Sequence, residues 1–288
     1  MTNASELRSG KTHRDEPTSE AVRRASGSSF YAAMRIMPKA QREAMFEIYS
    51  FCRAVDDIAD DDGPRDVRFD QLQRWRTAID ALYAGTVAPH LRGLALAVSG
   101  FDLQRADFLA VIDGMEMDVV STIRAPNLAT LDLYCDRVAS AVGRLSVRVF
   151  GMEKEAGLAL AHHLGRALQL TNILRDIDED GAIGRLYLPQ EALRDAGITT
   201  DDPAVALASP AIGQACAPIV ARAERHFAEA EAIMAQSPRR TVRTPRVMAA
   251  AYRMLLDQMI ARGWQAPRAP VRLRRWQFLW ILLRYAIV

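Results

Sequence analysis

The segment "QLTNILRDIDEDGAIGRLYLP", Gln169–Pro189, begins as an apolar run with the period of a helix. The run finishes in acids that precede a glycine, namely Asp176, Asp178, Glu179 and Asp180. At about 100° per residue, one arc of roughly 80° on this helix collects four polar side chains: Gln169, Asn172, Asp176 and Asp180. The segment therefore predicts a helix that is apolar apart from a single polar stripe.

A second stretch, "CRAVDDIADDDGP", Cys52–Pro64, has the same design. After an apolar, helix-periodic run it places five aspartates within seven positions: Asp56, Asp57, Asp60, Asp61 and Asp62. We expect this helix to begin after Pro38 and to end at Gly63-Pro64, with the acids in its last turns. A helix C-terminus is already negative, and each like-charge pair at i,i+4 costs roughly 0.2–0.5 kcal/mol. Nothing local offsets that cost, so the alternatives are a solvated charge run and a cation site.

The two stretches are more informative together than apart. In the first helix an arc of about 100° holds a comparable stripe: Tyr49, Arg53, Asp56, Asp57 and Asp60. Two such helices can face each other, and Mg²⁺ is typically held by a few carboxylates, waters and substrate phosphates. Arg53 and Arg175 are suited to the phosphate oxygens themselves. The paired stripes favour a metal and phosphate site over two unrelated surface helices.

The rest of the chain is helical in period, with Pro or Gly at the breaks. Helices are expected to begin near the following positions: Ser28, Pro38, Asp66, Leu103, Ala125, Gly151, Gln190, Ala211 and Thr244. The breaks are short and no repeat divides the chain. We predict an all-α protein with one helical domain over residues 21–288, preceded by a disordered tail over residues 1–20.

Composition narrows the class of protein. The chain has 288 residues, of which 50% are hydrophobic, and can bury a large core. Its 37 basic and 35 acidic residues leave a net charge of +2, so no overall field favours a nucleic-acid partner. Cys52, Cys135 and Cys216 are widely spaced and are expected to be reduced thiols. With no secretory signal and no apolar run long enough to span a bilayer, we expect a cytoplasmic protein.

Five segments resemble the successive motifs of the squalene/phytoene synthase family. They cover residues 28–189 and read "SSFYAAMRIMP", "IYSFCRAVDDIADD", "DGMEMD", "YCDRVASAVGRLSVRVFG" and "LQLTNILRDIDEDGAIGRLYLP". The resemblance implies a class I isoprenoid synthase fold around a central cavity and the head-to-head condensation of two prenyl diphosphates. The third and fourth segments look most like bacterial members that convert two farnesyl diphosphates to presqualene diphosphate for the squalene and hopanoid route.

The resemblance also implies roles for individual residues. Asp56, Asp60, Asp176 and Asp180 would be catalytic, because Mg²⁺ (or Mn²⁺) held there would bind the diphosphates and help one of them leave. The implied metal ligands are Asp56, Asp57, Asp60, Asn172, Asp176 and Asp180. The implied substrate-binding residues are Ser29, Phe30, Tyr49, Arg53, Tyr134, Gln169, Asn172, Arg175 and Tyr252. Asp118 could either line the cavity or face solvent.

Several alternatives stay open at this point. A phytoene synthase would condense two geranylgeranyl diphosphates by the same chemistry, and a full squalene synthase would add a reduction. No Rossmann fingerprint is present and NADPH is not expected, although related squalene synthases bind NADPH without that motif. A non-catalytic scaffold member of the family would not need the costly acids. His162 and His163 show no metal-ligand spacing to other His or Cys residues, which favours packing or surface roles.

The C-terminal segment "RAPVRLRRWQFLWILLRYAIV", Arg268–Val288, combines basic and apolar residues. Arg268, Arg272, Arg274 and Arg275 precede a run from Trp276 that is too short to span a bilayer. Basic residues beside Trp, Phe and Leu suit an interfacial segment, which could help pass a diprenyl product to downstream squalene-pathway enzymes. The alternatives are a peripheral membrane contact at the inner face of the cytoplasmic membrane and a last core helix.

Overall fold

The computed structural model describes residue 34 and residues 37–286, and this part of the chain contains helices and no strand. The elements are α3 (Lys39–Asp60), α4 (Arg65–Tyr83), η1 (Pro89–Leu91), α5 (Arg92–Phe101), α6 (Arg105–Val120), α7 (Leu128–Cys135), η2 (Asp136–Ser140), α8 (Ala141–Val149), α9 (Lys154–Arg175), α10 (Ile177–Ala182), α11 (Gln190–Asp195), α12 (Pro203–Ala208), α13 (Ile212–Gln236), α14 (Arg239–Arg262) and α15 (Arg275–Ala286). The predicted all-α class is confirmed. The expected tail, the helix near Ser28, and Ser29 and Phe30 lie outside the described residues.

Helix α3 forms because its apolar side chains repeat along one face. The buried residues follow the helical period: Ala44, Met45, Ile48, Phe51, Val55 and Ala59. The helix ends at Asp60, earlier than the predicted end at Gly63-Pro64, because Asp61 is extended and its carboxylate accepts the Gly63 backbone N–H at 2.6 Å. Such Asx turns compete with a helical backbone. Asp61 and Asp62 therefore lie beyond the helix.

The second acidic segment is bent where one straight helix was expected. Helix α9 ends at Arg175, Asp176 leaves helical geometry with φ −96° and ψ 13°, and α10 begins at Ile177. Backbone bonds of 2.8 Å still join Asp176 N to Asn172 O and Asp180 N to Asp176 O. The polar stripe therefore continues across the bend on consecutive turns.

Most of the other predicted helix starts lie within about three residues of the observed ones. The exception is α14, which begins at Arg239 and contains Pro245 inside the helix, whereas the prediction placed its start near Thr244. Helix α15 lies in the C-terminal segment for which a last core helix was one alternative, whereas α5 and α12 had no predicted start of their own. These two helices are short, so the sequence carries few periods from which to recognise them.

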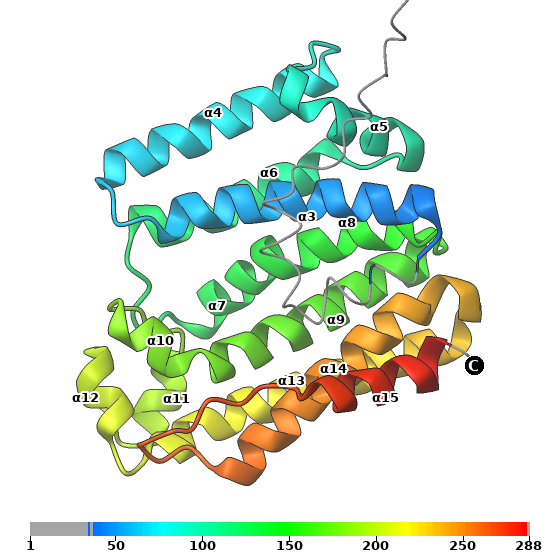
Figure 1. The fold of residues 1–288 in the computed structure, drawn as a ribbon. Coiled ribbons are helices and arrows are strands. Elements are labelled where there is room, and N and C mark those ends of the chain that lie inside the picture. The colour runs from blue at the N-terminus through cyan, green and yellow to red at the C-terminus, as the bar shows by residue number, and fades with distance from the viewer. Residues whose placement is uncertain (1–33, 35–36, 287–288) are drawn as a thin grey trace, which may run out of the picture.

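Two large hydrophobic cores divide most of the described residues, and a small third cluster joins α14 to α15. The first core joins α3, α4, α5, α6 and one face of α8, and the second joins α9, α13, α14 and the other face of α8. In Figure 1, α4 forms the upper edge, α13 to α15 form the lower edge, and α3, α8 and α9 lie between them. Val138 and Phe150 pack against both cores. The segment η2–α8 is therefore the seam of the molecule.

Glycines let α9 approach this seam closely. A Cβ placed on Gly165 would lie 2.8 Å from the backbone N and Cα of Ser140, and one on Gly143 would lie 3.1 Å from the Cα of Ala161. Ser140 closes η2, a single π-helical turn between α7 and α8. Such turns often occur at functional sites, because they redirect side chains within a continuous helix.

Candidate active site

A cavity of about 400 Å³ lies at the seam between the two cores. Its walls come from α3, α6, η2–α8, α9 and α14. Most of the lining is apolar, and charged and amide groups are contributed by four side chains: Arg53, Asp56, Gln169 and Asn172. The predicted central cavity is confirmed, and six of the predicted substrate or metal residues line it: Tyr49, Arg53, Asp56, Gln169, Asn172 and Tyr252.

The cavity has a polar end and an apolar end. Gly165 lies against Ser140, and nearer the start of α9 Gly157 lies against Val147, so α8 and α9 run antiparallel. Phe150 and Leu160 therefore line the end of the cavity away from Asn172. Leu160 and Asn172 are 12 positions apart on α9, or about 18 Å along its axis. The shape suits an extended apolar chain with a charged head.

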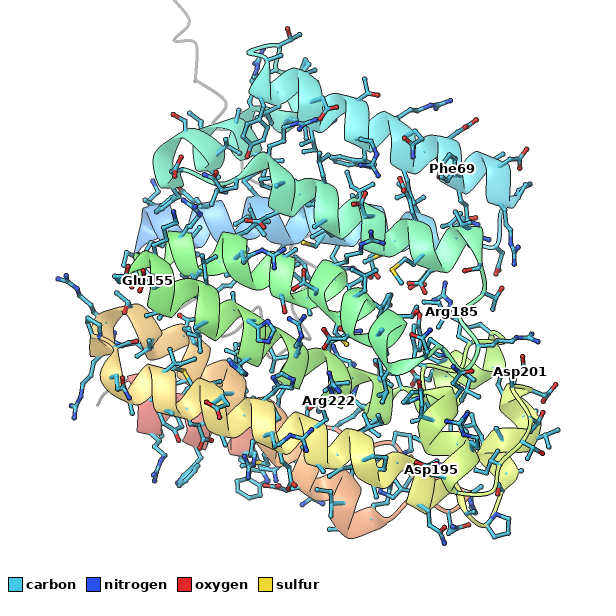
Figure 2. All side chains as sticks on the ribbon, turned by 180° about the vertical axis from the view of Figure 1, so that it is seen from behind. Phe69, Glu155, Arg185, Asp195, Asp201 and Arg222 are labelled. Atoms are coloured by element: carbon cyan, nitrogen blue, oxygen red, sulfur yellow. The ribbon has the colours of Figure 1, made fainter. Side chains whose placement is uncertain are left out.

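The acids that end α3 are paired with arginines. Arg53 bonds Asp56 at 2.6 Å and Asp57 at 2.5 Å. Arg185, which follows α10, bonds the Asp60 carboxylate at 2.7 Å and the Ala59 carbonyl at 3.0 Å. Arg185 thus ties the end of the second acidic segment to the end of the first. Figure 2 shows Arg185 at one end of the molecule and Glu155, in the first turn of α9, at the other.

The second acidic segment carries a matching arginine. Arg175 holds both carboxylate oxygens of Asp176, each at 2.6 Å. Burial opposes the Arg175 charge, but hydrogen bonds to Asp176 and Tyr252 outweigh it and keep the pKa of Arg175 above its usual value. One turn earlier, the Oδ1 atom of Asn172 is buried and has no hydrogen-bond partner among the described residues. A buried acceptor of this kind normally finds a donor or a cation.

The two acidic clusters act on each other electrostatically. Burial, followed by the charge of Asp60 and smaller effects of Asp57 and Asp118, raises the pKa of Asp56 to about 6 against the opposing effect of Arg53. Burial, Asp176, Asp118 and Asp60 raise the pKa of Asp180 to about 7, with Arg185 opposing them. Carboxylates from α3, α6 and α9–α10 therefore share one region. A divalent cation relieves such repulsion, and the orphaned Asn172 oxygen adds a neutral ligand of the type that Mg²⁺ accepts.

Beside these clusters, Asp118 is buried between two tyrosines. Its carboxylate accepts the hydroxyl of Tyr187 at 2.7 Å and that of Tyr134 at 3.0 Å, and the two rings stack with centroids 5.0 Å apart. Burial raises the pKa of Asp118, while Arg185 and both tyrosines oppose the shift. Tyr134 was expected at the cavity, but it is not among the residues that line the cavity.

The remaining predicted acids do not line the cavity themselves but interact with neighbouring charged residues. Asp57 bonds Arg53 and Asp176 bonds Arg175, while Asp60 and Asp180 act on the same group of carboxylates. Sequence reasoning assigned no role to Arg185 or Tyr187. Both stand in "GRLYLP", directly after the second acidic segment, and that position was the one signal that could have identified them.

The chain is similar to known proteins in both sequence and structure. The family model described as "Squalene/phytoene synthase" matches residues 23–277. A presqualene diphosphate synthase from Sinorhizobium fredii is 60% identical over 264 residues, covering 92% of this chain and 95% of the relative. One from Rhodopseudomonas palustris is 61% identical with the same coverage. The crystal structure of a dehydrosqualene synthase in complex with ligand superposes with a TM-score of 0.80 at 23% identity, covering 93% of this chain and 94% of that one. The chain belongs to the squalene/phytoene synthase family.

Proposed function

We propose that this protein condenses two farnesyl diphosphates head-to-head into presqualene diphosphate and diphosphate. The observation that carries the proposal is the cavity, which is apolar along its length and joined at one end by facing clusters of Arg and Asp. The names of the relatives that match nearly the whole chain support the same reaction. The apolar walls exclude water from an allylic cation that would otherwise be hydrolysed.

The acidic clusters suit Mg²⁺, with Asp56, Asp60, Asn172, Asp176 and Asp180 as its ligands. When bound, the metal supplies Lewis acidity and a template for the diphosphates. The three arginines that now hold these acids would exchange partners and turn to the phosphate oxygens: Arg53, Arg175 and Arg185. The exchange costs little free energy for Arg53, because partly exposed ion pairs at i,i+3 and i,i+4 contribute little to stability.

The test is to identify the product of the purified protein by mass. Farnesyl diphosphate with Mg²⁺ is expected to give presqualene diphosphate without a reductant, and addition of a chelator is expected to stop the reaction. Squalene that forms only with NADPH would make the protein a full squalene synthase. Phytoene from geranylgeranyl diphosphate would make it a phytoene synthase, and no product from either substrate would contradict an enzymatic role.

We further propose that α15 attaches the protein to an anionic lipid surface. Its exposed apolar side chains repeat at i, i+3, i+4 and i+7: Trp276 at 63%, Leu279 at 56%, Trp280 at 53% and Leu283 at 52%. Arg272, Arg274 and Arg284 are exposed nearby. The other face of α15 packs on α14 through Ile281, so the helix is held on the domain while its apolar stripe stays exposed. No helix among residues 37–286 is both long and apolar enough to span a bilayer.

One of the basic residues expected at the lipid surface has another role. The Arg268 side chain is 2% exposed and bonds Asp178 at 2.6 Å, so it fastens the segment before α15 to α10. Arginines that remain near an anionic surface contribute roughly 1 kcal/mol each. The proposed membrane contact therefore depends on Arg272, Arg274 and Arg284, which are exposed.

Flotation with anionic vesicles tests this proposal. Replacing Trp276 and Trp280 by Gln leaves the face on α14 intact, and is expected to abolish flotation that the wild type shows. Leu96, on α5 and 76% exposed, supplies the matched control, since Leu96→Gln is expected to float like the wild type. Equal flotation of all three folded proteins would show that α15 is not the lipid contact.

A further inference from the structure

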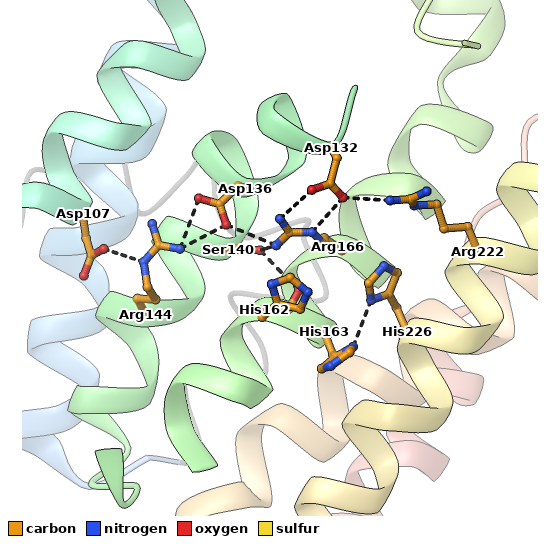
Figure 3. A network of polar contacts seen from close by, with 10 residues as sticks. All are labelled: Asp107, Asp132, Asp136, Ser140, Arg144, His162, His163, Arg166, Arg222 and His226. Atoms are coloured by element: carbon orange, nitrogen blue, oxygen red, sulfur yellow. Dashed lines mark hydrogen bonds and ion pairs between the residues drawn. The ribbon is translucent and has the colours of Figure 1, made fainter. Parts of the chain in front are cut away.

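Three of the five histidines of the chain meet at one place outside the cavity. His162 and His163 lie on α9, and His226 lies on α13. The Nδ1 atoms of His163 and His226 are 3.0 Å apart, and one ligand nitrogen from each of the three rings falls within 4.8 Å of the others. Figure 3 shows the three rings grouped between the two helices. The expectation that His162 and His163 lack metal-ligand neighbours did not foresee His226, which is 63 positions from His163.

The spacing of the nitrogens is close to that of a metal centre. Zn²⁺–N bonds of 2.0–2.1 Å at tetrahedral angles place ligand nitrogens about 3.3 Å apart, and no two can exceed about 4.2 Å. The pair at 3.0 Å needs to open by a few tenths of an ångström, whereas a pair at the 4.8 Å limit needs to close by about 1.5 Å. His162 is exposed, so its ring can turn toward the other two without disturbing the core.

The charges around the rings balance. Arg166 forms a two-armed ion pair with Asp132 at 2.9 and 3.0 Å and also bonds Asp136 at 3.1 Å. Arg222 bonds the same Asp132 at 3.0 Å. Arg144 bonds Asp136 as well as Asp107, so three arginines meet three carboxylates in this network (Figure 3).

The state of the rings also suits a metal ligand. Burial, together with the positive groups and the other rings, lowers the pKa of His226 to about 4. Burial and Arg166 likewise lower the pKa of His162, against the opposing charges of Asp132 and Asp136. Imidazole binds a metal in its neutral form, and a lowered pKa favours that form.

We propose that His162, His163 and His226 form a site for a first-row transition-metal dication, with Zn²⁺ as the expected occupant. Imidazole nitrogens suit Zn²⁺, Ni²⁺ and Cu²⁺, whereas Mg²⁺ prefers oxygen ligands, so this site and the acidic clusters select different ions. Three protein ligands leave a fourth position for water.

The site lies on another face of α9 from the cavity. His163 is two positions before Gly165, which lines the cavity, and so points roughly 160° away from it around the helix. None of the three histidines lines the cavity, and a bound ion would join α9 to α13. Because a ligand that binds only the folded state stabilises it, Zn²⁺ is expected to raise the melting temperature.

Calorimetric titration of metal-free, full-length protein with Zn²⁺ tests the site, with millimolar Mg²⁺ present to occupy the acidic clusters. The wild type is expected to bind one equivalent and to melt at a higher temperature with Zn²⁺. His226→Gln and His162→Gln are expected to weaken binding ~10-fold or more and to remove the gain in melting temperature. Because His162 is exposed, its variant reports on the site even if His226→Gln does not fold.

The matched control is His90, an exposed histidine on η1 that is distant in sequence from the other three. His90→Gln is expected to bind Zn²⁺ like the wild type. Co²⁺ adds a spectroscopic readout, since coordination by the cluster is expected to give visible absorption bands that the His162→Gln variant lacks. Equal Zn²⁺ affinity in the wild type and the folded cluster variants, or no binding at all, would overturn the proposal.

Discussion

At the residue scale, Asp56 and Asp180 are the clearest signs of function, because the metal-free protein disfavours the charged form of both carboxyl groups. Their pKa values are raised to about 6 and about 7 by burial and by neighbouring carboxylates. Arg53 and Arg185 reduce this repulsion without removing it. Groups with strongly shifted pKa values in a cleft are candidates for a functional site. The buried Asn172 oxygen, which has no hydrogen-bond partner among the described residues, is a second sign of a cation site there.

Asp56→Asn is expected to reduce turnover ~100-fold or more, because it would remove a ligand charge from the proposed metal site. The free energy of unfolding of the metal-free variant is expected to be unchanged or slightly higher, since like-charge repulsion falls. Product formation at saturating Mg²⁺ and urea unfolding measure the two effects. Asp62, exposed beyond the end of α3, is the control, and Asp62→Asn is expected to keep near-normal activity. Near-normal activity of Asp56→Asn would remove Asp56 from the site.

The same shifts predict how stability depends on pH. A carboxyl whose pKa is raised on folding binds more protons in the folded state, so its contribution to stability falls as pH rises from its unfolded value of about 4 through its folded value. For Asp56 and Asp180 that window runs from about pH 4 to about pH 7. The urea midpoint of the metal-free protein is expected to fall between pH 5 and pH 7.5 by more than that of the Asp56→Asn/Asp180→Asn double variant. Parallel slopes for the two proteins would contradict the shifts.

At the scale of the element, the sequence pattern predicted the features that depend on residues close together in the chain. The stripe on α3 was readable from sequence because six buried side chains follow one helical period. The end of α3 was misplaced because a single Asx turn at Asp61 decides it. The π turn η2 and the bend at Asp176 change the helical period within a few residues, which a regular 3.6-residue pattern cannot represent.

The site contacts that sequence reasoning missed join distant parts of the chain. Arg185 and Asp60 are 125 positions apart, and Tyr187 and Asp118 are 69 apart. Periodicity says which face of a helix is polar but not which other helix meets it. The two acidic segments could be paired from the sequence because each places repelling like charges at the end of a helix. Arg185 and Tyr187 have no such unfavourable feature and look like ordinary residues of a loop.

Gly165→Ala tests the close approach of α9 to η2. The new Cβ would lie 2.8 Å from backbone atoms of Ser140, which cannot rotate away, so the helices must separate. Overpacking of this kind costs about 1–3 kcal/mol, partly offset by about 1 kcal/mol from the better helix propensity of Ala. Gly100→Ala is the control, because nothing lies within 4 Å of its added Cβ and the change is expected to be neutral or stabilising. Urea unfolding compares the two, and equal effects would show that the approach is not tight.

At the scale of the whole molecule, the cavity exists because two cores meet without merging. Segment η2–α8 supplies one face to each core and its intervening residues to the cavity wall. Both acidic segments end on the same side in Figure 1, so one end of the seam collects charge while the other stays apolar. We therefore expect the length of the apolar part to decide which prenyl chain fits, and the acids to act on its diphosphate head.

Phe150→Ala is expected to shift the substrate preference toward geranylgeranyl diphosphate. Phe150 lines the cavity at the end away from Asn172 and packs between both cores, so removing its ring lengthens the apolar space. Fully buried Phe→Ala changes cost about 3–5 kcal/mol, and less is expected here because Phe150 is only partly buried. The measurement is the ratio of product formed from the longer and the shorter substrate when both are supplied together.

Phe69 is exposed on α4 and is marked in Figure 2. Phe69→Ala removes the same atoms away from the cavity, and is expected to leave the ratio unchanged. If folded Phe150→Ala kept the wild-type ratio, or if Phe69→Ala changed it equally, the far end of this cavity would not set chain length.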